Sequence, residues 1–413
     1  MGGTWGSEPG EDEIDVGCVR GTDFDHTHLV VDEEKLPIRS VSRRDLVARS
    51  LQCGDLILEK SGGGEQQPVG RCVRFTLNQL CVPTNFACRL RPLATTSDRF
   101  LAYLLTSLYS LGITRRAIKQ TTGIQNLDTE AFLREEVRAP NRATQERIAD
   151  FLDAETARID ALIEKKRRMV ELLDERRMAA MTEGVSGRLS GGDLVPSALL
   201  WLVVRPSHWA EVKLTLIARL GTGHTPSRDH PEWWEGRTIP WITTGEVAQM
   251  RSDRIEFISE TREMISELGV TNSSAEVHPA GTVVLCRTAS AGYSAIMGCD
   301  MATSQDFATW TCGPLLRPRF LLLCLRVMRQ DLLGRLAMGS THQTIYMPDI
   351  EAISVPVPPV REQDEIVEAV WGRLKTFDIA VDRLRHQIDL LVEHRQALIT
   401  AAVTGELDLG VAA

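Results

Sequence analysis

Residues that could perform chemistry are scattered along this sequence and form no recognisable catalytic pattern. The nine cysteines include no pair at CxxC spacing, which is typical of reduced core residues rather than disulfides or zinc ligands. His26 and His28 are close enough together to suggest a metal site, but no third or fourth ligand accompanies them. The Glu-x-Lys patterns at Glu33 and Glu164 lack the setting of a nuclease motif. There is also no Walker A loop and no glycine fingerprint for a dinucleotide or AdoMet, so we expect no catalytic site, metal or cofactor in this chain.

Two stretches of the chain have the charge balance that phosphate binding requires. The formal net charge is −9, but residues 1–34 hold ten Asp and Glu residues against one Arg, so the rest of the chain is neutral overall. Residues 84–133 and 281–348 each hold six Lys and Arg residues against three Asp and Glu. A local basic patch matters more for nucleic-acid contact than the net charge of the whole chain. Both stretches are therefore candidates for DNA contact.

The candidate contact residues are those suited to base edges or to phosphates. Glutamine, asparagine, arginine and histidine side chains can bind base edges through paired hydrogen bonds, and glycine-rich turns at 61–64 and 288–292 would let a DNA backbone approach closely. The turns could equally be plain hairpin turns, and each side chain an ordinary surface residue. The candidates are Ser61, Gly62, Gln66, Asn85, Arg115, Arg116, Lys119 and Gln125 in the first half, and Arg287, Thr288, Tyr293, Gln305, His342 and Gln343 in the second.

The chain contains two copies of one unit. Residues in 145–189 match residues in 363–407 at a constant offset of 218, for example Gln145 with Gln363 and Asp160 with Asp378. Further upstream the offset drifts, as when Phe86 matches Phe307, which indicates loops of different length. Each copy is therefore predicted to be a variable domain followed by a rigid segment.

The rigid segments are predicted to be long helices. Residues 361–402 contain no proline and only one glycine, Gly372, and their apolar residues step by three and four over more than four heptads. Residues 143–183 follow the same pattern, with Thr156, Lys166 and Arg177 making that copy less apolar. A helix of about 40 residues spans roughly 60 Å and needs a partner for its apolar stripe. Antiparallel pairing of the two copies is the simplest arrangement; a homodimer zipper or two solvated surface helices are the alternatives.

These observations predict an α+β protein with a pseudo-twofold repeat. Prolines near 140 and 356–359 mark the boundaries between domain and helix. The second copy has some fifteen residues before the glycine-rich start that the copies share, so either the start of the sequence is mis-assigned or the first domain lacks its opening strand. The expected parts are a first mixed α/β domain at 1–139, a long helix at 140–190, a linker at 191–207, a second mixed domain at 208–357 and a C-terminal long helix at 358–413. Predicted strands are 16–20, 55–58, 69–75, 239–243 and 282–286, and predicted domain helices are 99–111 and 319–328.

Both predicted long helices and the start of the second domain resemble those of a known family. The run from Gln145 to Ile163 is similar to the central conserved region of type I restriction–modification specificity subunits, and Arg395 to Gly405 is similar to their C-terminal conserved region. Residues 206–227 and 239–241 open the second variable domain as that family's domains open. The resemblance covers nearly the whole chain.

The resemblance implies a non-catalytic, DNA-binding specificity subunit with two target recognition domains, each binding one half of a bipartite target. It also implies that the paired helices form a coiled coil that sets the spacer and docks two methyltransferase subunits. The complete type I restriction enzyme, a site-specific deoxyribonuclease and adenine methyltransferase used for restriction and DNA modification, adds two translocase–nuclease subunits. AdoMet, ATP and Mg would be bound by those partner subunits.

The alternatives belong to other classes of protein. One is a coiled-coil assembly protein that does not bind DNA, and another is a single-chain DNA methyltransferase or nuclease, which the missing motifs disfavour. No apolar run approaches the roughly 20 residues of a membrane helix, and the acidic N-terminus is unlike a signal peptide. We therefore expect a cytoplasmic protein with no membrane contact.

Overall fold

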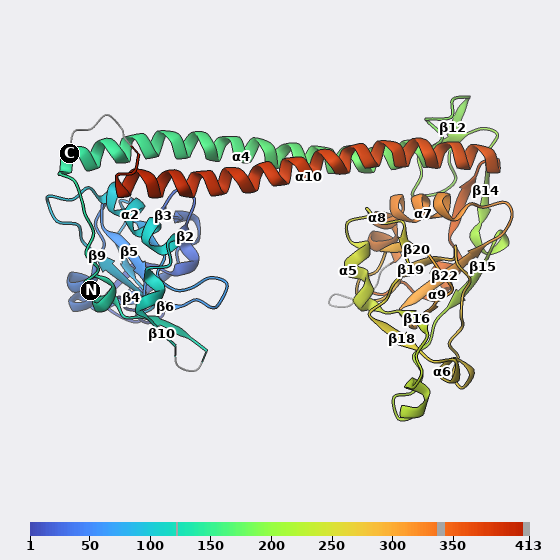
Figure 1. The fold of residues 1–413 in the computed structure, drawn as a ribbon, viewed down its shortest axis with the longest axis horizontal. Coiled ribbons are helices and arrows are strands. Elements are labelled where there is room, and N and C mark those ends of the chain that lie inside the picture. The colour runs from blue at the N-terminus through green and yellow to red at the C-terminus, as the bar shows by residue number, and fades with distance from the viewer. Residues whose placement is uncertain (121–122, 337–342, 408–413) are drawn as a thin grey trace. The chain divides into compact units, whose positions relative to one another are not determined.

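A computed structural model describes residues 1–120, 123–336 and 343–407 of the chain. The chain divides into two compact units, one made of Met1–Arg168 with Arg385–Ala413 and the other of Met169–Leu384. Each unit contains a mixed α/β domain and a part of each of two long helices (Figure 1). Within the described residues, no helix has an apolar stretch long enough for a bilayer crossing.

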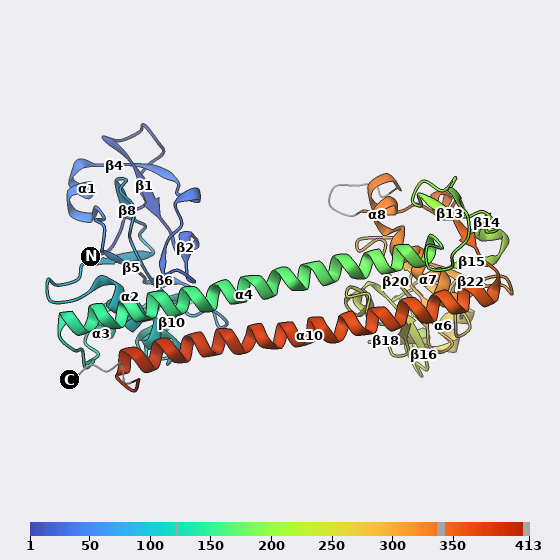
Figure 2. The ribbon, with the colours of Figure 1, turned by 90° about the horizontal axis from the view of Figure 1, so that it is seen from above.

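The two long helices are α4 (Arg142–Val185) and α10 (Val360–Thr404). In the first unit the start of α4 packs on the end of α10, where Leu152 and Ile399 share one buried core. In the second unit the end of α4 packs on the start of α10, where Met181 and Leu374 share another. Figures 1 and 2 show the helices side by side within each unit. The structure confirms the predicted antiparallel pairing within one chain.

The domain of the first unit is built on a five-stranded sheet in the order β2-β3-β7-β5-β9. Smaller sheets have the orders β4-β1-β8 and β10-β11-β6. Helix α2 covers the large sheet and buries Phe100 against Leu56 and Leu58. The strands are β1 (Ile14–Val19), β2 (Phe24–Asp25), β3 (Val30–Val31), β4 (Ile38–Val41), β5 (Leu56–Glu59), β6 (Ser61–Gly62), β7 (Cys72–Arg74), β8 (Cys81–Pro83), β9 (Ala87–Leu90), β10 (Ile118–Gln120) and β11 (Gln125–Leu127), and the helices are α1 (Arg43–Arg49), α2 (Asp98–Ser110) and α3 (Thr129–Phe132).

The domain of the second unit has a five-stranded sheet in the order β15-β22-β19-β20-β17 and a three-stranded sheet in the order β18-β16-β21. Two-stranded pairs β12-β13 and β14-β23 join it to the helices. The strands are β12 (Leu194–Pro196), β13 (Val204–Pro206), β14 (Ala210–Lys213), β15 (Ala218–Thr222), β16 (Ile239–Ile242), β17 (Phe257–Ile258), β18 (Glu263–Ile265), β19 (Val283–Cys286), β20 (Ser294–Met297), β21 (Ala302–Thr303), β22 (Phe307–Cys312) and β23 (Ser354–Val357), and the helices are α5 (Val247–Met250), α6 (Glu267–Thr271), α7 (Pro318–Val327), α8 (Arg329–Asp331) and α9 (Met347–Glu351).

The two domains repeat one topology, as the repeated sequence predicts. Strand β5 lies between β7 and β9 in one unit, as β19 lies between β20 and β22 in the other, and each is antiparallel to both neighbours. A short parallel strand, β3 or β17, then extends the sheet. Helix α2 and helix α7 follow the sheets at the predicted positions.

The outer edge of β9 shows where the two copies differ. In the second unit β15 pairs with β22 over five residues, whereas in the first unit only Met1–Gly3 lie along β9, with Gly3 donating from its N–H to the carbonyl of Ala87 (3.1 Å). Gly3 and Gly223 are equivalent, because a Cβ on either would stand about 2.0 or 1.9 Å from the carbonyl oxygens of Pro83 and Thr303. Both positions require glycine for this close approach.

Two predicted elements differ from the structure. The predicted strand at 69–75 is shorter, because Gly70 adopts a positive φ of 113° and β7 begins only at Cys72. The predicted linker at 191–207 contains the β12-β13 hairpin. Glu211 holds the turn of this hairpin by accepting hydrogen bonds from the Ser197 hydroxyl (2.5 Å) and the Ala198 N–H (3.1 Å).

Candidate nucleic-acid interface

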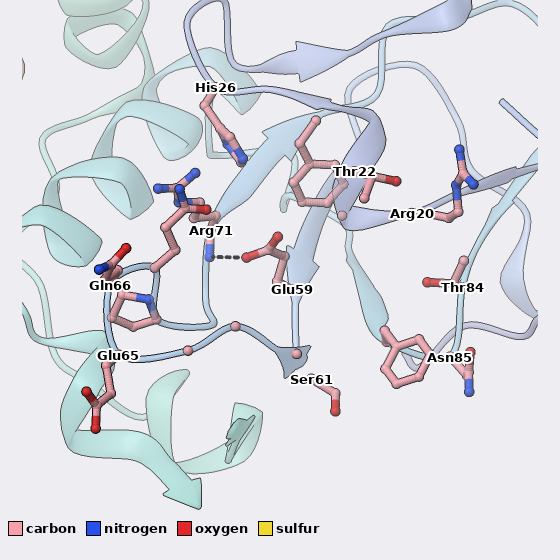
Figure 3. A pocket seen from close by; sticks show the side chains of 18 of the residues that line it. Arg20, Thr22, His26, Glu59, Ser61, Glu65, Gln66, Arg71, Thr84 and Asn85 are labelled. Atoms are coloured by element: carbon pink, nitrogen blue, oxygen red, sulfur yellow. Dashed lines mark hydrogen bonds between the residues drawn. The ribbon is translucent and has the colours of Figure 1, made fainter. Parts of the chain in front are cut away.

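A cavity of about 1410 Å³ opens in the first unit beyond the ends of β5 and β9 (Figure 3). The glycine-rich turn that follows β5 forms one wall. Gly62 and Gly63 have positive φ values of 116° and 68°, and the Gly64 N–H donates to the Gln67 carbonyl (2.9 Å). Four segments line the cavity: Trp5, residues 20–26, residues 59–71 and residues 84–86.

Arg71 is one of the residues that line this cavity. The Arg71 guanidinium donates from Nε to the Tyr109 hydroxyl (3.3 Å) and lies over the Tyr109 ring, 5.5 Å from its centroid. The Arg71 backbone N–H donates to the Glu59 carboxylate (3.3 Å), as Figure 3 shows. Tyr109 therefore holds the Arg71 guanidinium, while Glu59 holds the backbone of the same residue, and the cavity presents a cation that could bind an anion or an electron-rich base edge.

Burial governs the titration of the groups beside Arg71. Burial raises the pKa of Glu59. Burial, together with the nearby Arg71 cation, lowers the pKa of His26 to about 4. His26 is therefore neutral at pH 7 and offers one hydrogen-bond donor and one acceptor to a ligand.

The structure brings four of the predicted residues together at this cavity. Ser61, Gly62, Gln66 and Asn85 all line it, and Figure 3 labels three of them. The Ser61 hydroxyl donates to the Oδ1 atom of Asn126 (2.6 Å), because β6 pairs with β11. The side chains of Gln66 and Asn85 are exposed.

The other predicted residues of the first unit lie on adjoining elements. Arg115 and Arg116 are exposed on a single 3-10 turn (Thr114–Ala117), and Lys119 on β10 forms an ion pair with Asp128 (2.7 Å). Gln125 is buried, and its Oε1 atom accepts a hydrogen bond from the Val69 N–H (3.2 Å). Gln125 therefore supports the glycine-rich turn from within.

Several residues at the cavity were not predicted from the sequence. Trp5, Arg20, His26, Arg71 and Phe86 all line it. The Phe86 side chain is 53% exposed, although it follows the predicted Asn85 directly. Its position beside a predicted polar contact residue could have indicated a role in DNA contact, since exposed aromatic rings are suited to stacking on bases. Nothing in the local sequence marks Arg20 or Arg71, because separate strands bring them to this place.

The equivalent edge of the second unit gathers predicted residues around the turn after β19. Arg287 donates from Nε to the backbone carbonyl of Gln305 (2.9 Å), and the Ala289 N–H donates to the carbonyl of Gln343 (3.1 Å). Thr288 forms an isolated bridge with Thr344. The Gln305 side chain is exposed and accepts from the Thr225 hydroxyl (2.7 Å). Arg287, Thr288, Gln305 and Gln343 therefore form one cluster.

The two remaining predictions for the second unit have different outcomes. Tyr293 is half-buried, and the Arg329 guanidinium lies 4.5 Å from its ring centroid. Its ring therefore already has a cationic partner. His342 lies outside the described residues.

The two histidines considered for a metal site, His26 and His28, have different surroundings. His28 Nδ1 lies 2.6 Å from the Asp25 carboxylate, while His26 lines the cavity. Among the residues whose structure is described, no three His, Cys, Asp or Glu side chains are grouped as a metal site would require.

Comparison with known sequences identifies related proteins. Residues 206–393 match the family described as the type I restriction modification DNA specificity domain. The type I restriction enzyme MjaIX specificity subunit of Methanocaldococcus jannaschii is 27% identical over 187 residues, which are 45% of this chain and 41% of that protein. The EcoR124I/EcoR124II specificity subunit of Escherichia coli is 24% identical over 194 residues, which are 45% of this chain and 46% of that protein. The chain thus spans less than half the length of these curated relatives.

Solved structures share the fold over a longer range. A chain from a study of complex assembly and conformational transition of the type I R-M system aligns with a TM-score of 0.66 at 17% identity, covering 96% of this chain and 93% of that one. The HsdS subunit of Thermoanaerobacter tengcongensis aligns with a TM-score of 0.51 at 17% identity, covering 96% and 92%. Over residues 206–393 the sequence is similar to type I restriction–modification specificity subunits, and over nearly the whole chain the fold is shared with these solved structures.

Proposed function

We propose that this chain is the DNA-binding specificity subunit of a type I restriction–modification enzyme, with each mixed domain binding one half of a bipartite target. The observation that carries the proposal is the repeated sheet edge. Equivalent turns, after β5 and after β19, gather Ser61, Gln66 and Asn85 in one unit and Arg287, Gln305 and Gln343 in the other. These side chains have the hydrogen-bonding groups that distinguish base pairs in the major groove.

The glycine-rich turn and the nearby cations have a separate role in this proposal. The turn at Gly62–Gly64 lets a DNA backbone come close, since no side chain obstructs it. Exposed arginines such as Arg115 and Arg116 would bind phosphates, which position a duplex without specifying its sequence. Binding should therefore weaken with salt, because phosphate contacts release counterions.

The partners follow from the same proposal. The chain would act with two methyltransferase subunits and two translocase–nuclease subunits, in the cytoplasm, and would itself be non-catalytic. Apolar side chains that stay exposed on the long helices, such as Leu162, Leu172, Leu390 and Val392, offer docking area for a protein partner. AdoMet, ATP and Mg would belong to those partners.

A domain exchange tests the proposal. Residues 208–357 are replaced by the corresponding domain of another specificity subunit, and methylated adenines are mapped across the genome of cells that also hold the methyltransferase subunit. We expect one half of the methylated sequence to change and the other to stay. If both halves change, or neither does, the assignment of one domain to one half-sequence is wrong.

Binding by the purified chain separates this function from that of an assembly protein. A duplex that contains the mapped target should be retained on a filter with the chain at low salt. The double substitution R115A/R116A should weaken binding to target and non-target duplexes alike, whereas R134A is the matched control, because Arg134 is 76% exposed and pairs with Glu130 (2.9 Å). No binding of any duplex by the folded chain would favour the assembly protein.

A further inference from the structure

Two equivalent ion pairs connect the long helices. In the second unit Arg177 of α4 pairs with Asp378 of α10 at 3.1 Å. In the first unit Arg395 of α10 pairs with Asp160 of α4 at 2.9 Å. Both the arginines and the aspartates are 218 residues apart, so each unit contains one copy of the same contact.

Each of these arginines also binds a loop of its own domain. Arg177 donates to the carbonyls of Ser252 (3.3 Å) and Asp253 (2.5 Å), and Arg395 donates to the carbonyl of Thr27. The two loops are equivalent, since they precede β17 and β3, the short parallel strands of the two sheets. One guanidinium therefore joins both long helices to the domain.

A second attachment holds each domain to the other long helix. In the first unit Arg99 of α2 binds Glu146 (2.8 Å) and Asp153 (2.7 Å) of α4, while Arg395 belongs to α10. In the second unit Arg317 at the start of α7 binds Asp364 of α10 (3.0 Å), while Arg177 belongs to α4. Each domain is thus attached to both long helices, and attachment to two helices resists the rocking that attachment to one would allow.

The loops that bind the arginines lead directly to the candidate interface. In the second unit the Asp253 carboxylate binds both terminal nitrogens of Arg329 (2.6 and 2.8 Å), and Arg329 donates to the carbonyl of Gly292 (2.9 Å) in the turn after β19. In the first unit Thr27 follows His26, which lines the cavity. A movement of either loop would therefore displace part of the candidate interface.

These ion pairs are largely shielded from water. The side chains of Arg177 and Arg395 are only 8% and 12% exposed, and those of Asp378 and Asp160 are 20% and 15% exposed. A guanidinium holds its donors in a rigid planar fork, so the positions of its partners are fixed relative to each other. An ammonium group of lysine would supply the charge without that geometry.

We propose that Arg177 and Arg395 are positioning residues that fix each recognition domain on the helix pair and so make the enzyme strict about the number of base pairs between its two half-sequences. This proposal rests on the proposed function. It predicts that loss of either arginine leaves both half-sequences unchanged and relaxes the spacing between them.

The test uses R177M and R395M in the full chain, expressed with the methyltransferase subunit. R158M on α4 and R361M on α10 are matched controls, because those side chains are 80% and 92% exposed. Methylation is mapped at sites whose spacer has the normal length and at sites one base pair shorter or longer. We expect the preference for the normal spacer to fall about tenfold, which corresponds to about 1.4 kcal/mol, in R177M and R395M and to be unchanged in the controls.

Hydrogen exchange of the purified chain gives a readout that does not depend on DNA. The amides of residues 252–257 should exchange faster in R177M, and those of residues 26–31 faster in R395M. R177M is expected to fold, since Asp378 retains Arg254 as a partner (3.4 Å). R177K supplies a second variant, in which the charge remains and the relaxed spacing should persist.

Three results would overturn the inference. The first is a folded R177M or R177K protein with normal exchange at residues 252–257, whatever the DNA results. The second is a strict normal spacer in R177M, and the third is a changed half-sequence, which would make Arg177 a base-contacting residue. If the unaltered chain directs no bipartite methylation, the proposed function fails, and the exchange experiment still decides whether the arginines hold the loops.

Discussion

Two glycines in the long helices should respond in opposite ways to the same substitution. Gly184 near the end of α4 and Gly372 within α10 both lie in the second unit. A Cβ on Gly184 would stand 2.6 Å from Cγ2 of Val370 and 3.2 Å from Cγ2 of Ile366, whereas a Cβ on Gly372 would have no neighbour within 4 Å. Alanine at Gly184 should therefore destabilise the unit, and alanine at Gly372 should stabilise it.

The size of each effect follows from these distances. Ordinary carbon contacts lie at about 3.5–4.0 Å, so the G184A methyl group must separate the helices or displace Val370 by roughly 1 Å. Val370 is fully buried, and its β-branched side chain has essentially one χ1 rotamer in a helix. Overpacking of this kind costs about 1–3 kcal/mol, more than the helix-propensity gain of at most about 1 kcal/mol. G372A has only the helix-propensity gain, which should raise the free energy of unfolding by about 0.5–1 kcal/mol.

Tryptophan fluorescence can follow this unit selectively. Seven of the eight tryptophans lie within residues 169–384, so a thermal or urea transition monitored by their emission reports mainly on the second unit. We expect the midpoint of G184A to fall and that of G372A to rise, by about 2–4 °C for each kcal/mol in a unit of this size. Shifts of the same sign in both variants would show that close packing of α4 against α10 does not decide the outcome.

Three further outcomes are expected. Burial lowers the pKa of His26 to about 4 from an ordinary 6.5, so the unfolded chain takes up this proton first as the pH falls. The first unit should therefore lose stability between about pH 6.5 and 4. H26Q should reduce that loss in urea unfolding, and an unchanged pH profile of stability would contradict this expectation. The purified chain with AdoMet and target DNA should transfer no methyl groups, and transfer by the chain alone would refute the non-catalytic role. Insertion of one heptad after Lys165 and one after Arg383 should lengthen each helix by about 10 Å. The methylated spacer should then grow by roughly three base pairs at ~3.4 Å each, with both half-sequences unchanged. An active variant with the old spacer would show that the helices do not determine the distance between the half-sequences.

The long helices and the repeat could be predicted from the sequence because they depend on local periodicity. Apolar spacing of three and four, without proline, specifies a helix with one buried stripe, and the constant offset specifies two copies of it. Arg177 and Thr156 looked like interruptions of this stripe. In the structure each is buried with a partner: Arg177 binds Asp378, and the Thr156 hydroxyl donates to the carbonyl of Leu152 (2.7 Å).

The candidate interface was less accessible to prediction, because residue type does not reveal burial. Gln125 and Gln66 were equally good candidates by their chemistry, yet Gln125 is 7% exposed and supports a turn, while Gln66 lines the cavity. Arg71 was not selected, since its place at the cavity depends on the pairing of β7 with β5 and on the distant Tyr109. Such long-range contacts leave no periodic signal in the sequence.

Comparison of the two copies within the structure separates the shared scaffold from the interface. Gln145 and Gln363 match in sequence and make the same contacts. Each side chain accepts a hydrogen bond from a backbone N–H at the start of a domain helix, that of Ser97 (2.9 Å) for Gln145 and that of Arg317 (2.8 Å) for Gln363. Each side chain also donates to the carbonyl of the proline five residues before it (2.8 Å).

The interface edge differs between the copies. The structure corrects the sequence match of Phe86 with Phe307 by one residue, because Ala87 lies opposite Glu59 as Phe307 lies opposite Cys286. Phe86 is 53% exposed at the cavity, whereas its equivalent, Asp306, accepts a hydrogen bond from the Ser304 hydroxyl (3.1 Å). The two copies therefore share contacts where the domains meet the helices and present different residues where DNA contact is proposed. Two domains that share a scaffold but differ at this edge have the property required to bind two different half-sequences, because direct readout depends on which groups are presented to the base edges.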